Sequence, residues 1–362
     1  MSNSKKIFIV AGEPSGDLHA AEMIHALKKI APDAEYYSAG GTELAGCTDQ
    51  VSDLTQIAVT GLFEVLSYLP KISGIFNELV IKINEIDPDV IIFTDFPDFN
   101  FRLAKKLKKP GRRLVYFISP QLWAWRRGRI KQVKQLFDRM LVIFPFEEEF
   151  YAGYNVDAAY VGHPIVSIVK ERVFERKQRD KKRILLLPGS RKKEILFNLE
   201  VMVEAAKLLA GKVNADFAVL KHPLLDWQIF DPAEKAGIDV IESDPYSEFA
   251  NTDLAIACSG TVTFELAVMG VPTIVVYKMA RLSYRIIRSL VKIDTISIPN
   301  IVMNEKVFPE YIQDNAQPHS IAEKALQYLT DPEFYAGAKA RLEIFRQKMK
   351  PFDTDLAARS IF

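Results

Sequence analysis

Cysteine is scarce in this chain. Cys47 and Cys258 are the two cysteines among 362 residues, and neither has neighbours at a spacing typical of metal ligands. This pattern excludes a disulfide scaffold, and we expect both cysteines to be small buried residues in a reducing compartment. The sequence offers no convincing metal site and no cofactor motif, so we expect the protein to use neither.

An excess of charge is also missing, because 47 basic and 46 acidic residues leave a formal net charge of +1. Dedicated nucleic-acid binders usually carry a clear basic excess, so we expect no nucleic-acid partner. No run is long and apolar enough to span a bilayer. The run 7–11 is too short for a signal peptide and enters a glycine turn. We predict a cytoplasmic protein that can still lie on a membrane surface.

Short apolar runs that alternate with helical patterns are abundant, and they predict buried parallel strands. The predicted strands are 7–10, 90–93, 114–117, 140–144, 184–187, 217–220, 240–241, 254–257 and 273–276. The chain is too long for one ordinary core. We predict an α/β fold with two Rossmann-like, doubly wound domains that face a cleft, and a helical C-terminus. The predicted parts are an N-terminal domain at 1–168, a second domain at 169–345, and a tail at 346–362 that packs back on the N-terminal domain.

The stretch Ser259-Gly260-Thr261 joins a buried strand to a helix. Backbone N–H groups at such a turn, together with the helix dipole, favour a phosphate or diphosphate. Glu265 lies about one helical turn further on, where its carboxylate is suited to accept hydrogen bonds from a sugar's hydroxyls. These features suggest a nucleotide site. An ordinary capped helix packed on a sheet stays open as the alternative.

Two other segments add candidate binding residues. Ser190 and Arg191 follow the predicted strand 184–187, and arginine is well suited to bind phosphate. The alternative is a surface arginine on a turn. Pro299-Asn300 and Glu305 lie in what we predict to be a loop poor in regular structure, and such loops often bind ligands.

Carboxylates follow two predicted strands of the first half. Asp95 and Asp98 come directly after 90–93, where a general base or a helix cap is expected. Glu13, Ser15 and His19 lie in the turn after the first strand. Glu13 has no evident structural role and is the better functional candidate there. Ser15 is more simply a cap, and His19 a packed histidine.

Two segments point to a membrane surface. Arg281, Arg285 and Arg288 share one face of a predicted helix beside an apolar face, as in helices that lie on anionic lipid. A solvated charged face is the alternative. Trp123 and Arg126 belong to a stretch that mixes indoles with guanidinium groups, which suits an interface or phosphates.

Several segments, taken in order, resemble one family. They are Ala11-Gly-Glu-Pro-Ser-Gly-Asp17, Asp95-Phe-Pro-Asp-Phe-Asn100, Ser119-Pro-Gln-Leu-Trp-Ala-Trp-Arg126, Gly162-His163, Leu187-Pro-Gly-Ser-Arg191, Ser259-Gly-Thr261 with Glu265, and Pro299-Asn300. The set is similar to that of lipid-A-disaccharide synthases and covers most of the chain. One departure is the turn at Ala39-Gly40-Gly41-Thr42, where the family pattern is richer in glycine and continues with proline.

The resemblance implies a GT-B glycosyltransferase fold without a metal or cofactor. It implies transfer of 2,3-diacylglucosamine from UDP-2,3-diacylglucosamine to 2,3-diacylglucosamine 1-phosphate, with inversion, to give the β-1′,6-linked disaccharide and UDP. Glu265 would bind the ribose, Ser259 to Thr261 the diphosphate, Arg191 phosphate, and Asn300 another part of the donor.

For the base, the resemblance ranks Asp98 first, with Asp95 and Glu13 behind it. It also implies an anionic lipid surface at the cytoplasmic face of the inner membrane, and a homodimer is a further expectation. Two other functions stay open on the sequence. One is an isomerase like UDP-N-acetylglucosamine 2-epimerase, and the other is a non-catalytic nucleotide- or lipid-binding protein.

Overall fold

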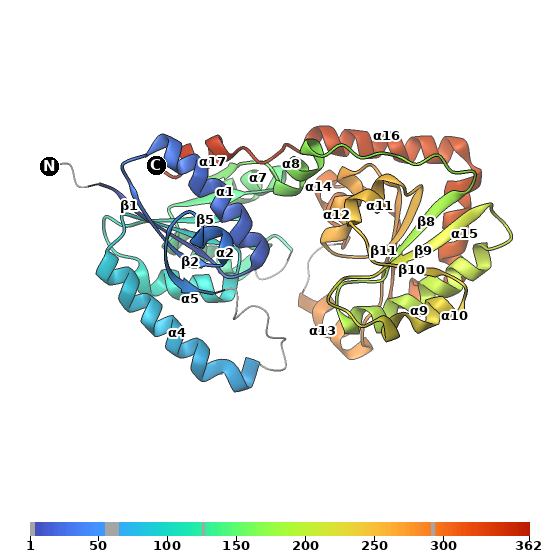
Figure 1. The fold of residues 1–362 in the computed structure, drawn as a ribbon, viewed down its shortest axis with the longest axis horizontal. Helices are drawn as coiled ribbons and strands as arrows, with labels where there is room; N and C mark the ends of the chain where they lie inside the picture. The colour runs from blue at the N-terminus through green and yellow to red at the C-terminus, as the bar shows by residue number, and fades with distance from the viewer. Residues whose placement is uncertain (1–3, 55–64, 125–126, 291–293) are drawn as a thin grey trace. The chain divides into compact units, whose positions relative to one another are not determined.

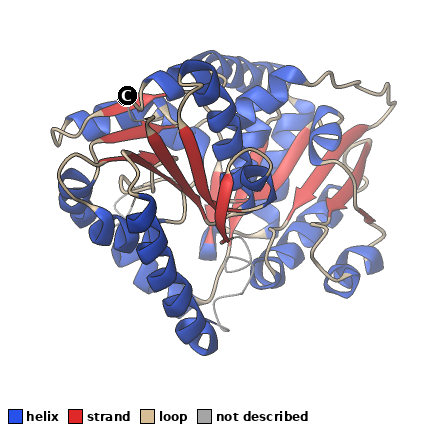
Figure 2. Ribbon diagram, turned by 60° about the vertical axis from the view of Figure 1, so that its left-hand side comes forward, coloured by secondary structure: helices blue, strands red, loops and turns tan. Residues whose placement is uncertain are grey.

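The computed structural model describes residues 4–54, 65–124, 127–290 and 294–362. The chain divides into two compact units (Figure 1). The first comprises Met1–Pro164 with Pro351–Phe362, and the second comprises Ile165–Lys350. Figure 2 shows that each unit holds one sheet, drawn in red, with helices packed around it. The predicted pair of doubly wound α/β domains is confirmed.

The first unit is built on a 7-stranded sheet with the order β3-β2-β1-β4-β5-β6-β7, and neighbouring strands are parallel. Its strands are β1 Lys6–Ala11, β2 Glu35–Gly40, β3 Asp49–Asp53, β4 Val90–Thr94, β5 Arg113–Phe117, β6 Arg139–Val142 and β7 Ala158–Tyr160. Its described helices are α1 Pro14–Ile30, α2 Thr42–Ala45, α4 Val65–Ile86, α5 Pro97–Leu107, η1 Arg127–Arg129, α6 Ile130–Leu136, α7 Pro145–Ala152 and α17 Thr354–Arg359. Helix α8, Pro164–Glu171, begins where the first unit ends.

Strand β1 explains why apolar runs without polar alternation form this sheet. Ile7 and Ile9 are buried against side chains of α1 and of the C-terminal segment. Phe8 and Val10 point to the other face and are buried against α4 and α5. A strand covered by helices on both faces needs apolar side chains at every position.

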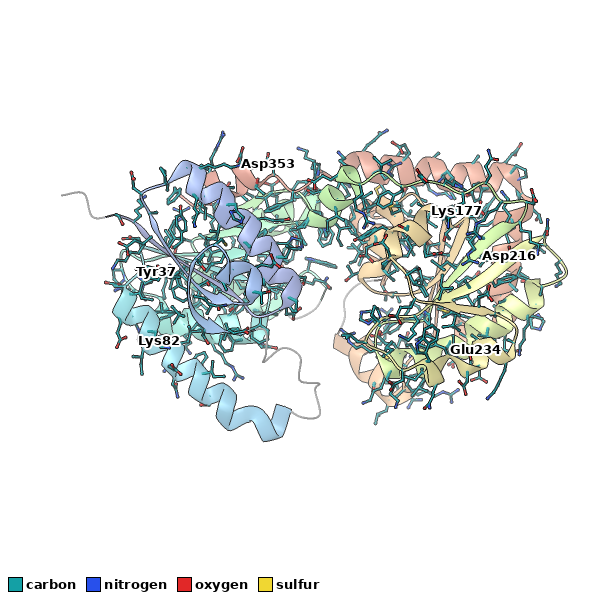
Figure 3. All side chains as sticks on the ribbon, viewed as in Figure 1. Tyr37, Lys82, Lys177, Asp216, Glu234 and Asp353 are labelled. Atoms are coloured by element: carbon teal, nitrogen blue, oxygen red, sulfur yellow. The ribbon has the colours of Figure 1, made fainter. Side chains whose placement is uncertain are left out.

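The C-terminal residues complete the core of the first unit. The ring of Phe352 stacks on that of Phe117 with centroids 5.3 Å apart, and α17 packs on α1. Asp353, labelled in Figure 3, accepts a hydrogen bond from the Leu356 amide at 2.8 Å, and its own amide donates to the Val161 carbonyl at 2.8 Å. The last twelve residues are therefore a structural part of the first unit.

The second unit is built on a 6-stranded parallel sheet with the order β10-β9-β8-β11-β12-β13. Its strands are β8 Lys182–Leu187, β9 Ala215–Leu220, β10 Asp239–Ile241, β11 Leu254–Cys258, β12 Thr273–Tyr277 and β13 Glu310–Ile312. Its described helices are α9 Lys192–Leu209, η2 Trp227–Phe230, α10 Asp231–Lys235, α11 Pro245–Ala250, α12 Thr261–Val268, α13 Arg281–Leu290, α14 Ile298–Met303, η3 Gln313–Asn315, α15 Pro318–Thr330 and α16 Pro332–Lys348.

One local prediction was wrong. The segment around Pro299-Asn300 is the helix α14, not a loop poor in regular structure. Pro299 lies in the first turn of α14, where its missing N–H costs no hydrogen bond. The buried state predicted for Cys47 and Cys258 is confirmed, and both are free thiols.

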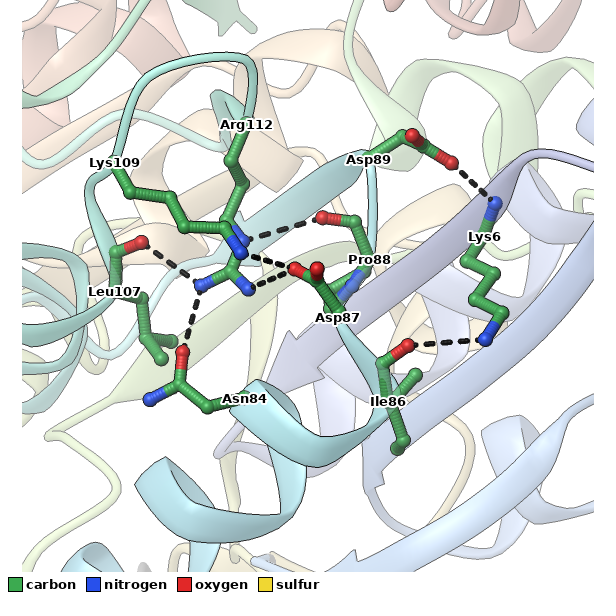
Figure 4. A network of polar contacts seen from close by, with 9 residues as sticks. All are labelled: Lys6, Asn84, Ile86, Asp87, Pro88, Asp89, Leu107, Lys109 and Arg112. Atoms are coloured by element: carbon green, nitrogen blue, oxygen red, sulfur yellow. Dashed lines mark hydrogen bonds and ion pairs between the residues drawn. The ribbon is translucent and has the colours of Figure 1, made fainter. Parts of the chain in front are cut away.

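A polar network ties the amino ends of the central strands of the first unit together (Figure 4). Arg112, just before β5, is 3% exposed. Its guanidinium donates to the Pro88 carbonyl at 3.2 Å, the Leu107 carbonyl at 2.9 Å and Asp87 at 2.8 Å. Lys6 at the start of β1 reaches the same region, with its ammonium 3.1 Å from the Ile86 carbonyl. These contacts lie at the edge of the sheet opposite the one where ligands are expected.

Replacing Arg112 by Met should therefore destabilise the fold without touching the site. The change leaves two buried carbonyl oxygens without their donor, which should lower the free energy of unfolding by about 2–4 kcal/mol. The urea midpoint of the purified variant measures this. Lys109→Met is the matched control, because Lys109 contacts Asp87 from the surface and should shift the midpoint little. Equal midpoints for the two variants would contradict the structural role given to Arg112.

Candidate functional site

A cavity of about 350 Å³ opens at the carboxyl edge of the second sheet, beside β8 and β11. Four segments form its walls: the turn after β8, the turn after β9, the start of α11, and the junction of β11 with α12. The strand order reverses between β8 and β11, and open α/β sheets bind ligands at such a switch point. The volume is within the usual range for small-molecule sites.

The junction of β11 with α12 presents backbone donors to this cavity. Ser259, Gly260 and Thr261 all line it. Gly260 is the N-cap of α12 and provides no side-chain cap, so amides of the first turn are available to a ligand. The Ser259 hydroxyl donates to the Ile296 carbonyl at 2.9 Å, which holds the turn in place. This wall is suited to bind an anion.

The turn after β8 adds a guanidinium to the same cavity. Arg191 precedes α9, and its side chain is 79% exposed. Its Nη1 lies 2.7 Å from Glu194 Oε1, and the Ser190 amide donates to Glu194 Oε2 at 3.3 Å. Sequence reasoning singled out Ser190 and Arg191 but missed Glu194, whose only signal was its position in the first turn of a helix.

Glu265 supplies the acceptor that the sequence predicted. Its carboxylate lines the cavity, and burial raises its pKa. The Tyr246 hydroxyl donates to Glu265 Oε1 at 3.0 Å, and in the described part of the chain no other hydrogen bond to this carboxylate is seen. Oε2 is therefore left for a ligand's hydroxyl groups. Tyr246 could not be predicted from the sequence, because that residue lies on α11 and meets Glu265 only in the fold.

The turn after β9 brings a buried cation to the wall of the cavity. Lys221 is 3% exposed and lines the cavity. Its ammonium lies 2.5 Å from Glu242 and 4.9 Å from the centroid of the Trp227 ring. Its position directly after a strand was the only sequence signal, and it was too general to assign a role.

Asn300 is not on the wall of this cavity. Its side chain is 1% exposed. Its amide nitrogen donates to the Phe308 carbonyl at 2.8 Å and to Glu310 at 2.9 Å, and its oxygen accepts from the Phe308 amide. These bonds give Asn300 a structural part in shaping the segment next to Ser259. Glu305 is exposed just after α14.

The switch point of the first sheet brings two predicted carboxylates together. Ala11 pairs with Thr94 in the ladder between β1 and β4, so Glu13 and Asp95 follow neighbouring strand ends. Asp95 is half-buried, and burial together with the charge of Glu13 raises its pKa to about 6. A carboxylate with this pKa is a stronger base than an ordinary aspartate.

The backbone at Asp95 is held in a costly conformation. Asp95 and Phe96 have φ values of 45° and 46°, which non-glycine residues rarely adopt. The Asp95 carbonyl accepts from Asn100 at 2.7 Å and from the Tyr116 hydroxyl at 2.6 Å. A Cβ at Gly12 would overlap the Phe96 ring, so this glycine is needed for the close approach. Strain of this kind clusters at functional sites.

Asp98 has a different environment from Asp95. Its side chain is 63% exposed, and it forms an ion pair with Arg129. It lies in the first turn of α5, where a carboxylate stabilises the helix through its dipole. The structure therefore separates the two aspartates, one half-buried with a raised pKa and the other paired at the surface.

The turn after β1 holds the remaining candidates of the first unit. Glu13 is the half-buried N-cap of α1, and Ser15 is exposed in its first turn. His19 is half-buried and lies 3.2 Å from Glu22. It also lies near the buried His163, whose pKa falls to about 3 because of burial and the charge of His19.

Trp123 is not part of an exposed surface. It is 5% exposed, and its indole N–H donates to Glu147 at 3.0 Å. Ser119 donates to the same carboxylate at 3.2 Å, and burial raises the pKa of Glu147 to about 7. Trp123 is therefore a buried, hydrogen-bonded side chain of the first unit. Arg126 lies outside the described residues.

The predicted basic helix is α13. Arg281, Arg285 and Arg288 are exposed, and the apolar Leu282 beside them is 71% exposed. Arg281 lies 3.6 Å from Asp314, and both side chains are 87% exposed. Among the described residues, no helix has the length and apolar character needed to cross a membrane. The same residues contain no group of three or more His, Cys, Asp or Glu side chains placed to hold a metal ion.

Solved structures define the class of this fold. The chain superposes on UDP-N-acetylglucosamine 2-epimerase from Neisseria meningitidis bound to UDP-GlcNAc with a TM-score of 0.65, at 13% identity, covering 98% of this chain and 99% of that one. The glycotransferase of kitacinnamycin gives a TM-score of 0.63 at 16% identity, covering 99% and 98%. Two parallel α/β units with such neighbours define the GT-B architecture.

Sequence comparison then gives the family. The model of lipid-A-disaccharide synthetase matches residues 7–359. Lipid-A-disaccharide synthase from Syntrophus aciditrophicus strain SB is 40% identical over 362 residues, covering 96% of this chain and 94% of that protein. The chain belongs to the lipid-A-disaccharide synthase family, whose members are glycosyltransferases.

Proposed function

We propose that this enzyme transfers 2,3-diacylglucosamine from UDP-2,3-diacylglucosamine to 2,3-diacylglucosamine 1-phosphate. The products would be UDP and the β-1′,6-linked lipid A disaccharide 1-phosphate. The observation that carries the proposal is the cavity of the second unit, which combines amide donors at Ser259 to Thr261, the Arg191 guanidinium and the Glu265 carboxylate. The proposed identity of the sugars rests on the membership of this chain in the family.

The cavity groups suit a nucleoside diphosphate. Backbone amides and Arg191 would bind the diphosphate and stabilise the charge that develops as it leaves. Glu265 Oε2 would accept hydrogen bonds from the ribose hydroxyls. Ser190 belongs to the same anion-binding turn. Asn300 would act indirectly, by holding the segment whose Ile296 carbonyl fixes Ser259.

The base of the reaction is proposed to be Asp95. The 6-hydroxyl oxygen of the acceptor would bond to the anomeric carbon of the donor while the bond from that carbon to UDP breaks. The hydroxyl proton would pass to Asp95, and the bonding electrons would leave with the diphosphate. Direct displacement inverts the anomeric centre and needs one base. Asp98, paired with Arg129, would orient this loop, and the charge of Glu13 would raise the basicity of Asp95.

The experiment that tests the function is a two-substrate assay in mixed micelles with UDP release as the readout. We expect UDP only when both lipid substrates are present. Formation of an epimer from UDP-N-acetylglucosamine alone would instead favour an isomerase. The Neisseria epimerase shares its fold with this chain. Inactivity with both lipid substrates, at intact UDP binding, would favour a non-catalytic binding protein.

We further propose that α13 docks on the anionic lipid of the cytoplasmic face of the inner membrane, where acylated substrates reside. Its exposed arginines beside Leu282 are the supporting observation. Ser15 and His19 would lie on the acceptor side, and a homodimer stays part of the proposal.

Reversing Arg281, Arg285 and Arg288 to Glu should weaken binding to anionic vesicles by about 10²-fold or more, because each cation contributes about 1 kcal/mol at such a surface. Vesicle sedimentation measures the change. Lys207, Lys212 and Lys235 reversed to Glu make a matched control, since they are exposed cations of the same unit. Equal losses for the two triple variants would contradict docking through α13.

A further inference from the structure

Glu194 lies where the proposed diphosphate would bind. It is the third residue of α9, and its side chain is 20% exposed. Oε1 accepts from Arg191 Nη1 at 2.7 Å, and Oε2 accepts from the Ser190 amide at 3.3 Å. Both donors line the cavity together with Glu194. One carboxylate therefore accepts from two of the donors that this turn presents to the cavity, the Ser190 amide and Arg191 Nη1.

The turn is shaped around this carboxylate. Gly189 has a φ of +129°, and a Cβ added there would lie 2.7 Å from Glu194 Cβ and 2.8 Å from Oε2. Any side chain at position 189 would push Glu194 away from the turn. The missing side chain lets the carboxylate lie directly over the Ser190 amide.

A phosphate and this carboxylate compete for the same groups. Both are anions, the Ser190 amide has one hydrogen to donate, and the Arg191 guanidinium would have to be shared between them. A carboxylate left beside a bound diphosphate would also repel it. The contacts of Glu194 with the Ser190 amide and with Arg191 would therefore oppose nucleotide binding, and they can re-form when the nucleotide leaves.

We propose that Glu194 is an internal competitor of the leaving diphosphate, which weakens the binding of UDP and so favours its release after transfer. The inference rests on the proposed function, because it takes the cavity to be the UDP site. It assigns to Glu194 the tuning of product affinity, a role separate from the contacts that bind the nucleotide.

The alternative is that Glu194 has the ordinary structural role of a carboxylate in the first turn of a helix. There it accepts a hydrogen bond from a backbone amide and interacts favourably with the helix dipole. In that case Glu194 would stay in place and hold Arg191 toward the ligand. The two roles differ in the sign of one measurement, because removing the charge tightens UDP binding in the first and weakens it in the second.

The test is the dissociation constant of UDP for Glu194→Gln, measured by calorimetry on the full chain. We expect the constant to fall about fivefold or more, the size expected when one opposing ion pair is removed. Uridine, which lacks phosphate, should bind both proteins equally. Glu204→Gln is the matched control, because Glu204 pairs with Lys207 on the same helix outside the cavity, and it should leave UDP affinity unchanged.

Unchanged or weaker UDP binding by Glu194→Gln would overturn the inference and leave the proposed function standing. Absence of UDP binding by the unmodified protein would overturn both. Glu194→Ser is a second variant that removes the carboxylate without retaining the amide, and it should also tighten UDP binding. In an Arg191→Ala background the gain from Glu194→Gln should shrink, since the competed donor is gone.

Discussion

Asp95→Asn should lower kcat by about 10²–10⁴-fold, the usual loss when a general base is removed. Asn keeps the size of the side chain and the strained backbone but cannot accept the proton of the acceptor hydroxyl. UDP affinity should change little, because the nucleotide cavity belongs to the second unit. UDP release with both lipid substrates present measures turnover, and calorimetry measures UDP binding.

The titration of Asp95 should also be visible in the dependence of turnover on pH in the unmodified enzyme. The pKa of Asp95 is raised to about 6, and a base acts only when it is deprotonated. The turnover rate should therefore fall as the pH drops through about 6, well above the range of an ordinary aspartate. The variant should lack this acid limb.

Asp98→Asn is the matched control for this prediction. Asp98 is exposed and paired with Arg129, so its loss should reduce turnover much less than the loss of Asp95. The reverse result, with full turnover in Asp95→Asn and a large loss in Asp98→Asn, would restore the order that the sequence motif suggested.

Arg191→Ala should raise the dissociation constant of UDP by about 10–100-fold, because hydrogen bonds between charged groups are among the strongest in proteins. Uridine binding should change little, since the guanidinium is proposed to contact phosphate. Competition against a labelled nucleotide, with unlabelled UDP and separately with uridine, would measure both dissociation constants.

Arg179→Ala is a suitable control for this variant. Arg179 is an exposed arginine of the same unit that does not line the cavity, and its removal should leave UDP affinity unchanged. If Arg191→Ala bound UDP as tightly as the unmodified protein, the anion site would have to lie elsewhere.

Most interior strands could be predicted from the sequence, whereas β2 and the edge strands β3, β7 and β13 could not. Strands such as β1 and β11 are continuous apolar runs, because helices cover both faces of the sheets. The strands β3, β7 and β13 are three to five residues long and lie at sheet edges. An edge strand has a neighbouring strand on one side only and is partly exposed to solvent, so its sequence shows a weaker apolar pattern.

Some residues of the candidate site could likewise be predicted from the sequence, and others could not. Residues directly after apolar strands, such as Arg191 and Asp95, were predicted from local sequence alone. Glu194 and Tyr246 were not, because their importance comes from the groups they meet in the fold. The ranking of Asp95 and Asp98 as candidate bases also depends on their burial and on the contact of Asp98 with Arg129. Two aspartates three residues apart in the sequence give no information about either.

The C-terminal segment has a consequence for how this protein is made. Phe352, Ala357 and Ile361 fill the core of the first unit beside α1, although 186 residues of the second unit separate them from Pro164. During synthesis, the first half of the chain therefore leaves the ribosome with a gap in its core. That gap closes only after residues 352–361 are translated, so the unit that begins first is completed after the second unit.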